Sequence, residues 1–168
     1  YLIMATEKGT IKKTVLSAYG NVRKGGINAI NLAAGDKLIE VKMTDGKNDI
    51  VIGTSHGFAI RFNEKDVRDM GRTATGVRGV RLGKGDHVVG LLVIRNDQTT
   101  VLVVTEKGFG KHSDINDYRI TKRGGKGVIT VKTTDKVGKL IAMMEVVDRD
   151  ELVIISTQGM IIRQSVKD

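Results

Sequence analysis

The strongest constraint on the fold is a sequence pattern that returns four times at intervals of about fifty residues. Each copy has an apolar, β-branched run, then a polar residue followed by glycine, then a second alternating run. The glycines fall at positions 9, 57, 108 and 159. Two strand-like runs joined by Lys-Gly, His-Gly or Gln-Gly predict a β-hairpin with a two-residue turn that needs positive φ. The copies are LIMATEKGTIKKT (2–14), DIVIGTSHGFAIRFN (49–63), TVLVVTEKGFGKHSD (100–114) and ELVIISTQGMIIRQS (151–165).

A second repeated element lies between the hairpins. The segments GINAINL, GVRGVRL and GKGVITV align without gaps, and their apolar positions alternate as in a half-buried strand. A turn and a further apolar strand follow each of them. Each unit therefore has four strands in about fifty residues, which is the period of a propeller-type blade. These segments are 26–32, 76–82 and 125–131, and the strands after them are 37–43, 88–94 and 139–147.

The pattern predicts an all-β fold. Only residues 63–70 and 113–118 are suited to a turn of helix, and 21 glycines with no proline indicate many tight turns. The expected domain is one incomplete ring of about three and a half blades, with units at 1–48, 49–99, 100–150 and 151–168. Three and a half blades do not close a ring, and the chain begins with Tyr1. We therefore expect the chain to be part of a longer domain.

The excess positive charge is concentrated in one element of the repeat. Residues 19–32, 68–85 and 118–132 carry net charges of +2, +4 and +5, which together exceed the +9 of the whole chain. The remaining residues are therefore slightly acidic. A net cationic chain indicates an acidic partner. Three equivalent basic segments, one in each unit, predict a cationic band along one perimeter of the molecule rather than charge scattered over a solvated surface.

Double-stranded DNA is the partner that suits such a band. Separated cations can neutralise phosphates along a bent duplex, and neighbouring glycines allow close approach of the backbone. Single-strand binders depend on aromatic stacking platforms, but the chain has only six aromatic residues. A propeller-type protein-interaction module is the alternative, and it would show an apolar patch on one ring face. An anionic-membrane binder is disfavoured because no amphipathic helix is expected.

No catalytic constellation is apparent in the sequence. Residues 71–78 have the glycine spacing of a phosphate-binding loop but lack the Lys-Ser/Thr that must follow. The histidines at 56, 87 and 112 lack metal-ligand spacing, and the acidic runs at 45–49 and 148–151 fall at predicted turns, where Asp and Asn bond local backbone. With no cysteine, a disulfide scaffold is excluded. We expect no catalysis, bound cofactor or metal in this chain alone.

The segment GRTATGVRGVRL (71–82), with GGINAINLAAGDKLI before it and KRGGKGVITVK after it, closely resembles the C-terminal domain of DNA gyrase A. The paralogous topoisomerase IV domain is similar in plan but matches less well. The resemblance covers essentially the whole chain. It implies a β-pinwheel, whose blades exchange strands, and a basic outer rim that wraps duplex DNA.

The resemblance also implies a setting. The parent would be an ATP-hydrolysing type II topoisomerase that introduces negative supercoils, in which gyrase A and gyrase B form an A2B2 enzyme using ATP and Mg²⁺ in the bacterial cytoplasm. No membrane partner is implied. On the rim, the predicted phosphate contacts are Arg23, Lys24, Arg72, Arg78, Arg81, Lys122, Arg123 and Lys126.

One motif departs from the family pattern. The family's signature box reads Gln-Arg-Arg-Gly-Gly-Lys-Gly and lies in the first blade, whereas residues 121–127 read TKRGGKG and lie in the third unit. These residues lack the glutamine. We therefore expect the chain to begin after the blade that carries the box, and we interpret KRGGKG as one step of the rim.

Overall fold

The computed structural model describes residues 1–167, which fold almost entirely into strands and turns. Short 3-10 turns (η) follow the first three hairpins, and none of the described residues forms a helix able to span a membrane. The strands are β1 (Leu2–Thr6), β2 (Thr10–Thr14), β3 (Leu38–Met43), β4 (Asp49–Thr54), β5 (Phe58–Asn63), β6 (Val77–Arg78), β7 (Val88–Ile94), β8 (Thr100–Thr105), β9 (Gly110–Asp114), β10 (Val128–Ile129), β11 (Leu140–Val146), β12 (Glu151–Ile155) and β13 (Ile161–Ser165). The 3-10 turns are η1 (Leu16–Tyr19), η2 (Glu64–Asp66) and η3 (Ile115–Asp117).

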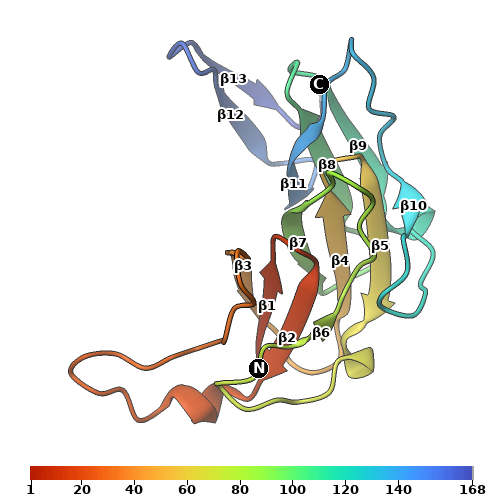
Figure 1. Ribbon diagram of the computed structural model, residues 1–168. Helices are drawn as coiled ribbons and strands as arrows, with labels where there is room; N and C mark the ends of the chain where they lie inside the picture. Colours follow the sequence, from red (N-terminus) through yellow and green to blue (C-terminus); the bar gives the residue numbers. More distant parts are fainter. Residues whose placement is uncertain (168) are drawn as a thin grey trace.

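The sheets exchange strands along the chain, which confirms the predicted β-pinwheel. Their strand orders are β3-β1-β2-β6, β10-β5-β4-β7, β11-β8-β9 and β12-β13. Strand β6 belongs to the second unit in sequence but pairs with β2 of the first, and β10 of the third unit pairs with β5 of the second. The inner strands β3, β7 and β11 lie side by side, so β6 and β10 occupy the outer edges (Figure 1).

The hairpin turns differ in detail from the prediction. The first loop has three residues, Glu7 to Gly9, and the Gly9 amide donates to the Thr6 carbonyl at 3.0 Å. Within residues 1–167, positive φ occurs at glycine alone, with φ values of 84° at Gly9 and 78° at Gly57. A type I turn followed by a left-handed glycine fits these data, because it closes a three-residue hairpin. The expected two-residue turn was therefore wrong, although the need for glycine was predicted correctly.

Two details of the second repeated element also differ from expectation. Residues 26–32 form no strand, because no hairpin edge among the described residues lies beside them. The gapless alignment of 125–131 with 76–82 is wrong by two residues. Val128 and Ile129, rather than Lys126 and Gly127, take the places of Val77 and Arg78, because Gly127 is the glycine that lies against the partner hairpin. The three longer strands after these segments were predicted correctly, as were the turns η2 and η3, whereas η1 was not anticipated.

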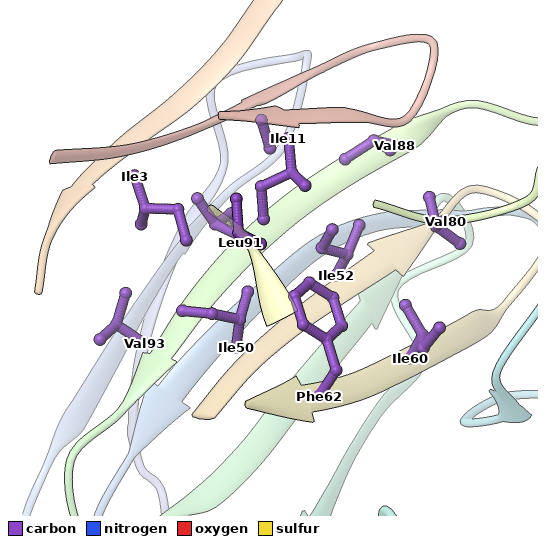
Figure 2. Close-up of a cluster of buried hydrophobic side chains, with 12 residues drawn as sticks. Ile3, Ile11, Ile50, Ile52, Ile60, Phe62, Val80, Val88, Leu91 and Val93 are labelled. Carbon is purple, nitrogen blue, oxygen red and sulfur yellow. The ribbon is translucent and has the colours of Figure 1, made fainter. Parts of the chain in front are cut away.

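The core is divided between neighbouring sheets. Isoleucine and valine side chains of the first two sheets, with Phe62 and Leu91, form one buried cluster (Figure 2). A second cluster, which includes Val101, Ile115, Tyr118 and Met143, joins the second and third sheets. Among residues 1–167, the third cluster has three buried members, Leu102, Val146 and Val166. The β12–β13 hairpin is thus the least buried of the four, and it projects from the rest of the fold in Figure 1.

A buried cation joins the first sheet to the second and the second to the third. Lys13 on β2 donates to the Glu64 carbonyl of η2 at 3.2 Å, and Arg61 on β5 donates to the Ile115 carbonyl of η3 at 2.8 Å. These residues occupy the same position in their hairpins, four after the turn glycine. Backbone bonds accompany them, from Met70 to the Lys13 carbonyl and from Thr121 to the Arg61 carbonyl, both at 2.8 Å. Because the cation, the bond and the strand exchange recur together, consecutive blades are held in one fixed relation.

A carboxylate accepts hydrogen bonds from the turn of each of the first two hairpins. Asp86 accepts hydrogen bonds from the Thr54 and Ser55 hydroxyls and from the His56 and His87 amides, at 2.8–2.9 Å. Asp36 has the same position in the first unit. Burial alone would raise the pKa of Asp86, but these bonds and the nearby His56 hold it below its usual value.

The glycine that precedes each outer strand provides a test of the strand exchange. Gly127 has a φ of 84°, and a Cβ there would overlap the Ala59 carbonyl. Gly26 has a φ of 81° with open space around it. Gly26→Ala should lower the unfolding free energy by about 1–2 kcal/mol, because the only penalty is a side chain on a left-handed backbone. Gly127→Ala adds a steric overlap, so it should lower the unfolding free energy by about 2–5 kcal/mol. Urea unfolding of both variants measures the difference. Equal losses would contradict the close contact of β10 with β5.

Asp86 should make the fold sensitive to acid. Since its folded pKa lies below the unfolded value, its contribution is complete above the unfolded pKa, near 4, and is lost as pH falls through the folded pKa. Asp86→Asn should therefore lower the unfolding free energy at pH 7 and flatten its decline below pH 4. Urea unfolding at several pH values measures this, with the exposed Asp148→Asn as the control. An unchanged acid slope in Asp86→Asn would refute the assignment.

Candidate nucleic-acid interface

The three basic segments lie at the outer side of the sheets. Arg78 is on the edge strand β6, Arg81 follows β6, and Lys126 lies two residues before the start of β10. Arg23 and Lys24 are exposed on the long loop between η1 and β3, which extends away from the sheets in Figure 1. Strand exchange places β6 and β10 on the edges of the preceding sheets. It thereby brings the basic segments of successive units next to one another.

The first and second basic segments are joined by a buried lysine. The ammonium of Lys12, which is fully buried, donates to the Ala29 carbonyl at 2.6 Å and also to the Arg72 carbonyl. The Arg72 guanidinium donates to the Asn28 carbonyl at 2.9 Å. Burial, together with the Arg72 charge, lowers the pKa of Lys12. Lys12 therefore fixes the path of both segments.

The second and third segments are joined by main-chain bonds and by Arg123. The Gly124 amide donates to the Gly79 carbonyl at 2.6 Å, and the Arg81 amide donates to the Gly125 carbonyl at 2.8 Å. The Arg123 guanidinium bridges the Asp66 carbonyl, at 2.8 Å, and the Arg78 carbonyl, at 3.0 Å. The three segments thus form one connected surface, which we call the basic band: residues 19–32, 68–85 and 118–132.

The cations of the basic band differ in how they are bonded. Lys122 forms an ion pair with Asp66 at 3.0 Å, and it is the one member of the predicted set of eight with an acidic partner among residues 1–167. Arg72 and Arg123 donate to neutral carbonyls, so their charge is retained. Lys126 lies over the Phe58 ring at 4.2 Å. Within the same residues, no hydrogen bond or ion pair engages the exposed side chains of the other four, Arg23, Lys24, Arg78 and Arg81.

Two relevant residues were missing from the predicted set. Lys132 is exposed at the position equivalent to Arg81, once the strands are aligned by their pairing. The repeat could have revealed it if the third segment had been aligned correctly. The sequence gives weaker evidence for a role of Lys12, which is a lysine at the hairpin position where the second unit has Ile60.

The acidic runs behave as predicted for turns. Asp45 accepts from the Lys47 amide and the Asn48 side chain, and Asp150 accepts from the Val147 amide. No three His, Asp or Glu side chains in the described part of the chain come close enough to hold a metal ion.

Sheets that exchange edge strands around an open ring, with cations gathered on the outer edge, define a β-pinwheel domain. The chain belongs to the family described as DNA gyrase C-terminal domain, beta-propeller, which matches residues 1–45, 48–95, 99–146 and 150–168. Each of the four matched ranges begins one residue before a copy of the hairpin.

Relatives in sequence and in structure agree with this assignment. The chain is 44% identical over 169 residues to the DNA gyrase A protein of Staphylococcus aureus (strain MRSA252), and the match covers 100% of this chain and 19% of that protein. The solved C-terminal domain of DNA topoisomerase IV has a TM-score of 0.94 at 28% identity, covering 100% of this chain and 53% of the other. The DNA gyrase A C-terminal domain has a TM-score of 0.88 at 26% identity, covering 99% and 56%.

Arg123 should be needed for the shape of the band as well as for its charge. Arg123→Lys keeps the charge but removes the planar group that reaches two carbonyls, so it should lower the unfolding free energy by about 1 kcal/mol. Arg81→Lys is the matched control, because no hydrogen bond engages the Arg81 side chain in the described residues. Thermal unfolding of both variants measures the difference. Equal midpoints would show that Arg123 does not join the segments.

Proposed function

We propose that this chain binds double-stranded DNA without sequence specificity and bends it along the basic band. The observation that carries the proposal is the continuity of the band: main-chain bonds, Lys12 and Arg123 connect three cationic segments from successive units. Seven of the eight predicted contact residues lack an acidic partner within residues 1–167. Their charges are therefore available to phosphates.

A distributed band suits a bent duplex for energetic reasons. Bending a 20–30 base-pair site by 40–90° costs on the order of 1–6 kcal/mol. Phosphate contacts spread over several blades can offset this cost along the whole bend, whereas one local patch cannot. Each neutralised phosphate releases counterions, so the affinity should fall with salt at a logarithmic slope of about −0.9 per contact.

The wider setting follows from the family. We propose that the parent protein is a type IIA DNA topoisomerase of the gyrase kind, in the bacterial cytoplasm, and that this domain wraps DNA so that ATP-driven strand passage introduces negative supercoils. The rest of gyrase A, together with gyrase B, would then be its protein partners. ATP and Mg²⁺ would act in those other parts of the A2B2 enzyme.

A protein-interaction module is the alternative, and one observation favours it. Val153, Ile155, Met160 and Ile161 of the β12–β13 hairpin region are exposed apolar residues. These strands pair only with each other among residues 1–167, whereas the other hairpins have further strands beside them. A gel-shift titration of a 40-base-pair duplex at two salt concentrations separates the two functions. Absent or salt-insensitive binding would refute the DNA proposal.

Charge reversal at the band should separate binding from folding. Arg78→Glu with Arg81→Glu should weaken duplex binding by at least tenfold and reduce the salt slope by about 2, because two contacts are lost. The unfolding free energy should change by less than about 1 kcal/mol, since exposed charges contribute little to folding. Lys47→Glu with Lys111→Glu, which lie outside the band, is the matched control. Retained binding together with a lowered unfolding midpoint would show that the arginines are structural.

A further inference from the structure

One step of the basic band carries an apolar side chain where its counterpart carries a cation. In the first sheet Arg78 of β6 pairs with Thr10, and in the second sheet Ile129 of β10 pairs with Phe58. Thr10 and Phe58 both follow the turn glycine of their hairpins, so Arg78 and Ile129 occupy the same place on successive outer edges. A basic edge is thereby interrupted at one defined point.

Ile129 is exposed on a backbone that is hydrogen-bonded to the neighbouring hairpin, and a cation lies nearby. Its side chain is 58% exposed and stands beside Phe58, whose ring is covered by the Lys126 ammonium at 4.2 Å. The Thr130 amide donates to the Gly57 carbonyl at 2.9 Å and fixes the backbone just after it. A β-branched side chain on such a backbone has little rotamer freedom.

Ile129 and Phe58 also line a groove of about 830 Å³. Three lysines line the same groove, Lys107, Lys132 and Lys139, against two carboxylates, Glu106 and Asp135. The site therefore offers a short apolar surface beside a groove in which cations outnumber carboxylates. Base steps provide an apolar surface and the adjoining backbone provides phosphates, so a duplex matches both parts.

We propose that Ile129 is a wedge that presses between base pairs in the minor groove of the bound duplex and partly unstacks one step. This inference rests on the proposed function and adds a defined point of bending to it. Apolar side chains inserted at base steps kink DNA, and pyrimidine–purine steps such as TA open most easily. The lysines of the groove hold the backbone on either side. The chain would then position itself on deformable sequence without reading base edges.

The test uses 40-base-pair duplexes that contain 2-aminopurine at a central TA step, whose fluorescence rises when the base unstacks. The 168-residue chain is compared with Ile129→Ala, which removes the wedge, and with Ile129→Arg, which restores the residue type of the preceding blade. Val153→Ala is the matched control, since Val153 is a β-branched residue with 60% exposure on β12. Affinity is measured at several salt concentrations on TA-containing and A-tract duplexes.

The unsubstituted chain and Val153→Ala should raise the fluorescence and should prefer the TA duplex by several-fold. Ile129→Ala should lose most of the fluorescence rise and most of this preference, with an unchanged salt slope. Ile129→Arg should lose the rise as well and steepen the slope by about 0.9, as one added phosphate contact requires. An unchanged rise in Ile129→Ala, or salt-dependent binding by the unsubstituted chain with no rise, would overturn the wedge alone. Failure of the unsubstituted chain to bind duplex would overturn the proposed function and the wedge with it.

Discussion

The strands that the second and third units contribute to the sheets before them are the contacts on which the remaining structure depends. Strands β6 and β10 are only two residues long, so their own hydrogen bonds are few. They hold because a left-handed glycine brings the chain against the partner hairpin and because a buried cation of that hairpin binds the 3-10 turn that precedes each strand in the chain. Core clusters shared between sheets then complete the junction. Removing any one of these elements would leave the others with unpaired polar groups or open space.

Strand exchange also determines which cations are buried and which are exposed. Lys13, Arg61 and Lys12 point inward and donate to carbonyls or carboxylates, which offsets the cost of burying them. The cations of the outer segments remain in solvent, where their charge can act on a partner. Lysine and arginine therefore either bind buried oxygens or carry exposed charge, and their position relative to the turn glycine decides between the two. The third junction departs from this pattern, since His112 stands where Lys13 and Arg61 stand and is exposed.

Much of this fold could be predicted from the sequence, because the same pattern of residues occurs in several units. The turn glycines, the long strands and the basic segments all recur with the period, and glycine has few alternatives at positive φ. The register of β10 could not be obtained in this way. Either Gly125 or Gly127 could be the glycine that lies against the partner hairpin, and only the contact of Gly127 with the Ala59 carbonyl distinguishes them. The burial of the Lys12 side chain could not be predicted either, since it depends on carbonyls 17 and 60 residues away.

The rigidity of the junctions bears on how the domain would act on DNA. A flexible set of basic loops could follow a straight duplex and neutralise its phosphates without bending it. Here each basic segment is bonded to the next, and the blades that carry them are fixed by buried contacts, so the curvature of the band belongs to the protein. A duplex that uses cations from all three segments must therefore adopt that curvature itself. The deformation energy then falls on the DNA, and the ease with which a sequence bends becomes part of its affinity.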